Sequence, residues 1–225
     1  METAISLNGI VERLFPTFTK LSLEEQKYSL SLYRILAQGE SVSRDMLADT
    51  LNISHEKINH FLKDKMGVYY DDHQNIIGYM GLAIPKMTHQ FTVNNKTLYT
   101  WCAWDSLFIP ALLDMTAQVE SVCQTTKEPI HISINPDGIA NMDPSDAVMS
   151  VLIPDIGDKG FEESCCKDVI SSFCHFVYFF KSHETGLDWI NSRKERYALL
   201  SIKEAFELGR RFNDYVHGDV LSVKH

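Results

Sequence analysis

Apolar residues recur at helical spacing through the first third of the chain. A short amphipathic segment ends at Pro16, and a longer one over residues 23–39 ends at a glycine, which commonly follows a helix. Ser43 and Ser54 each precede a further apolar run, in the position from which a serine side chain accepts a hydrogen bond from the first helical turn. The pattern therefore predicts a short N-terminal helix followed by three more.

The pattern then changes to strands. Residues 67–70 and 76–82 flank a polar turn at residues 71–75, which predicts a β-hairpin. Three helices followed by a hairpin is the order of a winged helix, in which residues 54–65 would be the DNA recognition helix. However, acidic side chains outnumber basic ones by eight to six between residues 25 and 72, and this charge favours a structural or docking role on the same frame.

The rest of the chain predicts strands and helices mixed in one α+β unit. Strands are expected at residues 90–94, 117–122, 130–134, 147–153 and 175–180, and helices at residues 100–113, 161–173, 187–191 and 201–215. Thr100 is the expected N-cap of the first of these helices. The predicted fold class is α+β, with a three-helix winged-helix-like domain over residues 1–82. A mainly antiparallel sheet flanked by helices would follow over residues 83–225.

Composition narrows the choice of partners. The chain has 225 residues and a net charge of −9, which disfavours nucleic acid as the main partner because phosphate binding needs a basic surface. No apolar run approaches the ~20 residues that cross a bilayer, and the N-terminal residues lack the basic start and apolar centre of a signal peptide. We therefore expect a cytoplasmic protein with no membrane partner.

The sequence contains five cysteines, an odd number, and no export signal. Reduced thiols are the expected state, and none of the spacings matches the Cys-x2-4-Cys pairs of a zinc finger. The five are Cys102, Cys123, Cys165, Cys166 and Cys174. A metal site would therefore have to be assembled from distant parts of the chain. Gly-rich phosphate loops and the zinc-protease motif are absent from the sequence.

The most informative stretch is residues 99–113, an apolar run that contains one thiol and one carboxylate. Cys102 and Asp105 are three residues apart, which places both side chains on one face of a helix. Burial penalises the charged form of each, so the site would set their ionisation, and groups of this kind are candidates for chemistry. The alternatives are a structural buried cysteine and a solvated acid in the first helical turn.

The other cysteines carry weaker signals. Cys174 opens an aromatic segment and could simply fill the core, while the side chain of His175 would point to the opposite face of a strand. Cys165 and Cys166 are adjacent in a polar segment, where we expect both to be exposed, and they receive no firm role.

A resemblance to a known family connects these residues. Residues 101–112 read Trp-Cys-Ala-Trp-Asp-Ser-Leu-Phe-Ile-Pro-Ala-Leu, which resembles the Trp-Cys-Ala-x-Asp-[Ser/Thr]-Leu-x-x-Pro-Ala-Leu segment of the alkylmercury (organomercurial) lyases. The similarity continues at residues 76–79, 121–123, 172–174 and 205–210.

The resemblance spans about residues 30–213 and implies the family's fold, a winged-helix-like domain on an α+β catalytic domain. It also implies that Cys102 and Cys174 bind the mercury of R–Hg⁺, with Asp105 as an additional candidate ligand. Asp105 would help to deprotonate a thiol and then deliver a proton to carbon, which releases R–H and leaves Hg(II) on the two thiolates.

The same resemblance implies no organic cofactor and a structural role for Cys123. An external thiol or a mercuric reductase would then take the Hg(II). Three features depart from the family pattern: a longer connection over residues 154–171 that contains Cys165 and Cys166, His175 where some members have cysteine, and Trp104 in place of a smaller residue. Two alternatives stay open, a thiol-based metal or redox sensor that binds DNA, and a protein that sequesters mercury without turnover.

Overall fold

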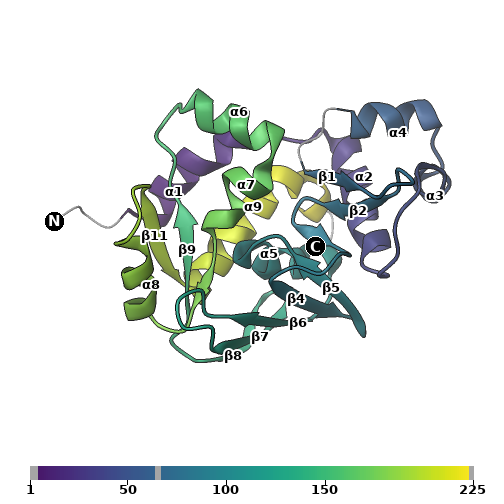
Figure 1. The fold of residues 1–225 in the computed structure, drawn as a ribbon. Coiled ribbons are helices and arrows are strands. Elements are labelled where there is room, and N and C mark those ends of the chain that lie inside the picture. The colour runs from purple at the N-terminus through teal and green to yellow at the C-terminus, as the bar shows by residue number, and fades with distance from the viewer. Residues whose placement is uncertain (1–4, 64–66, 223–225) are drawn as a thin grey trace.

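An eight-stranded antiparallel sheet forms one layer of the molecule, and helices cover its inner face (Figure 1). The structure is a computed structural model that describes residues 5–63 and 67–222. Residues 1–4, part of the stretch searched for an export signal, and residues 64–65, the end of the expected recognition helix, lie outside the described residues. The α+β class, with N-terminal helices followed by an antiparallel sheet flanked by helices, is confirmed.

The helices follow the chain in this order. They are α1 (Leu7–Leu14), the 3-10 turn η1 (Phe15–Thr17), α2 (Leu23–Leu36), α3 (Arg44–Leu51), α4 (His55–Leu62), α5 (Ala103–Leu113), α6 (Lys159–Lys167), α7 (Val169–Ser172), the 3-10 turn η2 (Cys174–Phe176), α8 (His183–Ile190) and α9 (Ile202–Leu221). Ser43 and Ser54 cap α3 and α4 through their side-chain oxygens, as expected. The predicted hairpin is also confirmed, because β1 (Val68–Tyr70) pairs antiparallel with β2 (Ile76–Tyr79).

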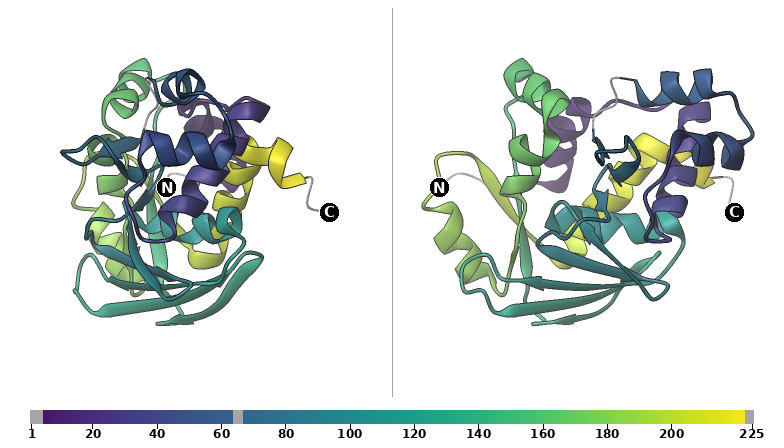
Figure 2. Two further views of the ribbon diagram at one scale, coloured as in Figure 1. Left: turned by 90° about the vertical axis from the view of Figure 1, so that its right-hand side faces the viewer. Right: turned by 45° about the vertical axis from the view of Figure 1, so that its right-hand side comes forward.

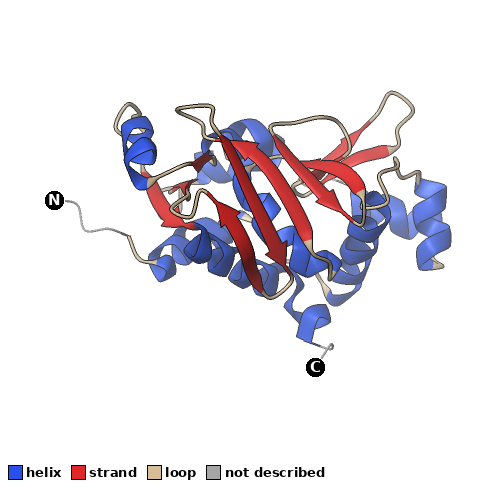
Figure 3. Cartoon of the chain, turned by 90° about the horizontal axis from the view of Figure 1, so that it is seen from below, coloured by secondary structure: helices blue, strands red, loops and turns tan. Residues whose placement is uncertain are grey.

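The large sheet has the strand order β1-β2-β3-β5-β4-β6-β7-β8. The remaining strands of this sheet are β3 (Leu82–Ala83), β4 (His89–Val93), β5 (Lys96–Thr100), β6 (Ala117–Val122), β7 (Pro129–Asn135) and β8 (Gly138–Asp143). Along β6 and β7 buried and more exposed residues alternate, as expected for a sheet with one solvated face, and Figure 3 shows the helices behind the sheet. A second sheet has the order β10-β9-β11, from β9 (Val148–Leu152), β10 (Phe179–Phe180) and β11 (Tyr197–Ser201).

The hairpin strands belong to the same sheet as the rest of the chain. Leu82 pairs with Tyr79 of β2 and with Thr100 of β5, so the sheet is continuous across the expected boundary between residues 82 and 83. Helices α2 and α9, far apart in sequence, pack against each other above the sheet (Figure 2). The division into residues 1–82 and 83–225 stays a prediction.

Helix α5 lies in the centre of the core. Ten of its residues are buried, so it has no solvated face. Helix α9 packs closely along it, since a Cβ on Gly209 would lie 2.7 Å from the Cβ of Phe108. Two polar contacts fix the pair: the Trp104 indole N–H donates to the carbonyl of Ala205 at 3.2 Å, and the Asn213 amide donates to the carbonyl of Phe108 at 3.0 Å.

Several sequence expectations were wrong in detail. Thr100 is the last residue of β5, and Cys102 is the N-cap of α5; the Thr100 hydroxyl instead donates to the Cys102 carbonyl at 3.0 Å. The helix expected over residues 161–173 is divided at Asp168, whose backbone is extended and whose carboxylate caps α7.

The strand expected over residues 175–180 is reduced to Phe179–Phe180, because the 3-10 turn η2 precedes it. The aromatic run favoured a strand locally, but hydrogen bonds to Ser150 hold the chain in a turn there. The Ser150 hydroxyl donates to the Phe176 carbonyl and accepts from the Tyr178 N–H, both at 3.0 Å. Strands β5, β8 and β11 were not expected. Among the described residues, each helix is too short or too polar to cross a membrane.

Candidate active site

The three reactive side chains predicted from the sequence converge in the structure. The Sγ atoms of Cys102 and Cys174 and a carboxylate oxygen of Asp105 all lie within 4.8 Å of one another. Cys102 and Asp105 come from the start of α5, and Cys174 is the first residue of η2. All three are buried, and within the described part of the chain they form the one such grouping of potential metal ligands.

A capping box holds Asp105 beside Cys102. The backbone N–H of Cys102 donates to Oδ2 of Asp105 at 2.9 Å, as expected when an acid stands at the third position of a helix. This short-range bond orients the carboxylate toward the helix N-terminus, where the positive end of the helix dipole favours negative charge. The three-residue spacing therefore places a carboxylate beside the Cys102 thiol.

The turn between β2 and β3 closes over Asp105. Gly81 has φ +101°, and a Cβ built on it would lie 2.6 Å from the Cγ and Oδ1 atoms of Asp105. Glycine is needed here for both the backbone conformation and the close approach. The turn is held in place by the Tyr33 hydroxyl, which donates to the Met80 carbonyl at 2.6 Å, and by the Trp101 N–H, which donates to the Gly81 carbonyl at 2.9 Å.

Cys174 is brought to α5 by the segment around η2. The Ala103 N–H donates to the carbonyl of Val177 at 3.3 Å, which joins the start of α5 to the chain just after Cys174. On the other side, the ring of Phe173 packs edge-on against Trp104, with 6.1 Å between centroids. Backbone and aromatic contacts thus fix a thiol from 72 positions downstream beside the Cys102–Asp105 pair.

Burial controls the ionisation of all three groups. Desolvation raises the pKa of Asp105 to about 6, although hydrogen bonds from Cys102 oppose the change. The pKa of the Cys102 thiol is raised well above its usual value, mainly by burial. For Cys174 the hydrogen bond with Cys102 lowers the pKa, but burial and the charges of Asp105 and Asp168 outweigh it, so the pKa is raised. The raised pKa values favour protonated thiols and leave Asp105 the most readily ionised of the three groups near neutral pH.

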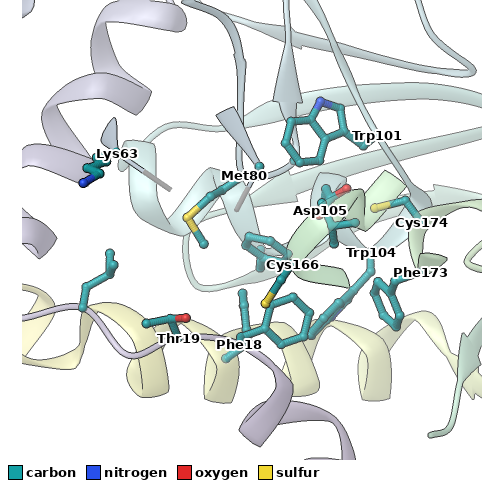
Figure 4. A pocket seen from close by; sticks show the side chains of 16 residues that line it. Phe18, Thr19, Lys63, Met80, Trp101, Trp104, Asp105, Cys166, Phe173 and Cys174 are labelled. Carbon is teal, nitrogen blue, oxygen red and sulfur yellow. The ribbon is translucent and has the colours of Figure 1, made fainter. Parts of the chain in front are cut away.

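Asp105 and Cys174 open onto an apolar cavity of about 170 Å³, drawn in Figure 4. Its walls come from both halves of the chain and are Phe18, Thr19, Leu21, Lys63, Gly67, Met80, Gly81, Trp101, Trp104, Asp105, Phe108, Cys166, Val169, Phe173, Cys174 and Phe212. Cys102 is fully buried and is not part of the wall. A ligand in the cavity would therefore meet Cys174 before Cys102.

The remaining sequence candidates lie outside the trio. Cys123 is buried at the end of β6, where its sulfur accepts the Thr126 N–H at 3.5 Å. His175 is exposed. Cys165 is buried, which corrects the expectation that it is exposed, because the helical turn of α6 places it inward; Cys166 is exposed as expected.

Sequence patterns did not reveal that Cys166, Gly81 and Met80 contribute to the cavity. The glycine in the turn after a strand was the available signal for a close backbone approach. The other two gave no local signal, because their place in the wall depends on how distant segments pack.

Comparison with known proteins agrees with this site. The family model described as alkylmercury lyase matches residues 82–214, more than half of the chain. This chain belongs to the alkylmercury lyase family. An alkylmercury lyase from Bacillus cereus is 36% identical over 179 residues, which cover 80% of this chain and 77% of the relative. One from Pseudomonas putida is 34% identical over 180 residues, covering 80% of each chain.

A solved structure shares the fold of this alkylmercury lyase family member. The crystal structure of the mercury-bound form of MerB2 superimposes with a TM-score of 0.73 and 20% sequence identity. The match covers 92% of this chain and 98% of that one. The architecture is therefore that of MerB2 along nearly the whole chain.

Proposed function

We propose that this enzyme of the alkylmercury lyase family cleaves the carbon–mercury bond of R–Hg⁺ at Cys102, Cys174 and Asp105. The observation that carries the proposal is the buried cluster itself: two thiols and one carboxylate within 4.8 Å, next to an apolar cavity. Thiolate is the ligand that soft metals prefer, an extension of the ligand-softness rule to mercury. The apolar wall accommodates an alkyl or aryl group and excludes water.

Mercury binding begins at Cys174 because its side chain lines the cavity. Formation of the first S–Hg bond displaces the thiol proton. Cys102 then binds the same mercury and transfers its proton to ionised Asp105, whose carboxylate lies beside it. A pKa of about 6 leaves Asp105 mostly ionised at neutral pH and able to act as this base.

Cleavage follows when protonated Asp105 returns the proton to the carbon bound to mercury. Two thiolate ligands increase electron density on the mercury, so the Hg–C bond electrons become the C–H bond. R–H leaves, Hg(II) stays on Cys102 and Cys174, and Asp105 is ionised again. The balance is R–Hg⁺ plus two thiols giving R–H, Hg(II) dithiolate and one net proton released.

Product removal needs a partner outside the site. A small external thiol, or a mercuric reductase, would accept Hg(II), and the reaction uses no organic cofactor. Asp105 would be an additional ligand to the bound mercury. The five unpaired cysteines of the chain suit a reducing compartment, which supports a cytoplasmic location.

We also propose that the N-terminal helices and the β1–β2 hairpin form a winged-helix-like unit, and that the role of this unit is structural. A DNA-binding sensor is disfavoured by charge. Lys57 of α4, on the helix that would enter the groove, already forms a 2.8 Å ion pair with Glu24, and the net charge of the protein is −9.

The test is hydrocarbon release. The protein is incubated with a phenylmercury salt and excess small thiol, and benzene is measured by gas chromatography. We expect catalytic benzene production by the wild type. Cys102→Ala and Cys174→Ala should each abolish benzene release, because each variant keeps only one of the two thiolates that the proposed cleavage needs. Asp105→Ala should keep mercury binding and lose about a hundredfold or more in rate, typical of a lost general acid–base group.

Two results would contradict the proposal in different ways. Stoichiometric Hg(II) binding without benzene above the protein-free control would identify a sequestering protein. A salt-sensitive shift of operator DNA at physiological ionic strength, together with the absence of benzene, would favour the sensor. As a control, Cys123→Ala removes a thiol outside the trio and should retain turnover.

A further inference from the structure

On the basis of the function proposed above, we propose that Cys166 is a mercury-transfer thiol. It accepts Hg(II) from the Cys102–Cys174 pair and presents it to thiols in solution. The residue is located near the end of α6, in the segment that connects β9 to η2.

Cys166 borders two spaces at once. Its side chain lines the cavity that contains Asp105 and Cys174, as Figure 4 shows. It also lines an open depression on the outer surface of α6, together with charged side chains such as Glu163 and Lys167. Cys166 is thus exposed to solvent and also lies on the wall of the cavity that Cys174 lines.

Release of Hg(II) is otherwise hindered by burial. Cys102 has no exposed surface and Cys174 is 4% exposed, so both sulfurs that hold the product lie inside the core. A small thiol that carries charged groups would have to enter an apolar cavity of about 170 Å³, and moving such groups out of water is unfavourable. An exposed protein thiol on the cavity wall removes this requirement.

Transfer proceeds by ligand exchange at mercury and needs no oxidant or reductant. The Cys166 sulfur forms a new Hg–S bond, the Hg–S bond to Cys174 breaks, and the Cys166 proton passes to the released thiolate. A first external thiol then displaces Cys102 from the mercury and a second displaces Cys166, and each passes its proton to the thiolate that it releases. Mercury stays Hg(II) throughout, and each exchange conserves charge and protons.

The neighbouring cysteine provides a matched control. Cys165 has no exposed surface and does not line the cavity, although it lies close enough for the charge of Cys174 to raise its pKa. Both cysteines belong to α6, so a non-specific effect of losing a thiol from this helix would appear in either variant.

The first experiment uses the wild-type protein and inorganic Hg(II), so it does not depend on carbon–mercury cleavage. One equivalent of Hg(II) is added, and the protein is desalted so that no small thiol and no unbound Hg(II) remain. Alkylation of Cys166 by iodoacetamide is then followed by peptide mass spectrometry. We expect slower alkylation of Cys166 with Hg(II) than without it, and no such protection in Cys174→Ala. Equal alkylation rates in the wild type would overturn the proposal.

The second experiment measures the ratio of steady-state to single-turnover benzene release. In Cys166→Ala this ratio should fall about tenfold at low thiol concentration and recover at high thiol concentration, because only product exchange is slowed. Cys165→Ala should keep the wild-type ratio. An unchanged ratio in Cys166→Ala at low thiol would refute the transfer role. Absence of benzene from the wild type would instead refute the lyase proposal.

Discussion

Asp105 shows how burial changes the ionisation of a common side chain. Its carboxylate accepts the Cys102 N–H, yet desolvation dominates and raises its pKa to about 6. In the proposed mechanism, a pKa in this range lets one group act as a base toward a thiol and as an acid toward carbon near neutral pH. The cost is stability, because the ionised form is less favourable in the folded protein than in the unfolded chain.

The pH dependence of stability tests this cost. The pKa of Asp105 is higher in the folded protein than in the unfolded chain, so protonated Asp105 favours the folded state. This contribution to the free energy of unfolding is fully present below about pH 4 and is lost as pH rises through about 6. Asp105→Asn stays neutral, so its free energy of unfolding relative to wild type should rise by roughly 3 kcal/mol between pH 4 and 8. Urea unfolding of both proteins measures the difference. A difference independent of pH would show that Asp105 titrates normally.

Gly81 is a second residue on which the site depends. In Gly81→Ala the new Cβ would lie 2.6 Å from the Asp105 carboxyl group, at a backbone φ of +101°. We expect a loss of about 2–4 kcal/mol in the free energy of unfolding, together with a large fall in the rate of benzene release. Gly138→Ala, where no atom lies within 4 Å, should change stability by less than about 0.5 kcal/mol. Equal effects of the two substitutions would contradict the role of Gly81.

The α5–α9 pair decides where the active groups lie. Helix α5 is buried on all sides, so its position is fixed by what packs on it rather than by an amphipathic pattern. Helix α9 approaches closely at Gly209 and donates the Asn213 amide to the Phe108 carbonyl at 3.0 Å. A shift of α5 would move Cys102 and Asp105 away from Cys174, which belongs to a different element.

Substitutions at two glycines of α9 distinguish the effect of helix packing on stability from the effect of helix propensity. Gly209→Ala should destabilise the protein by about 1–3 kcal/mol, because its Cβ would lie 2.7 Å from the Cβ of Phe108. The Cβ that Gly218→Ala adds would meet no atom within 4 Å. This substitution should stabilise the protein by up to about 1 kcal/mol, since alanine is the better helix former. Thermal unfolding measures both. Stabilisation by Gly209→Ala would mean that the two helices are less closely packed than described.

The helix caps and turns were the features of these elements that the local sequence predicted best. Ser43 and Ser54 act on their own helices, so local sequence was sufficient to locate them. Thr100 failed as the cap of α5 because strand pairing extends through it, with His89 of the adjoining hairpin strand β4 and with Leu82 of β3. The pairing with β3 joins residues too far apart in the sequence for a short window to contain it. The 3-10 turn at Cys174 was missed for a similar reason, because Ser150 on another strand holds it.

At the scale of the whole molecule, the cavity belongs to no single segment. Phe18 and Lys63 are the residues that follow η1 and α4, Gly81 comes from the turn between β2 and β3, and Phe212 comes from α9. The sheet continues from the hairpin strands to β8, so the N-terminal elements are attached to the layer that carries the site. This arrangement gives the N-terminal helices and the β1–β2 hairpin a structural role in building the cavity.

The sequence by itself determined the α+β class, the capped helices, and the local pair of Cys102 and Asp105, because each depends on periodicity or on contacts within a few residues. The resemblance to one family then related this pair to Cys174. Only the tertiary structure decided that the three groups lie within 4.8 Å and that burial raises the pKa of Asp105 to about 6. It also decided that Cys165 is buried while Cys166 borders the cavity. Desolvation and proximity depend on how distant segments pack, and no local pattern contains that information.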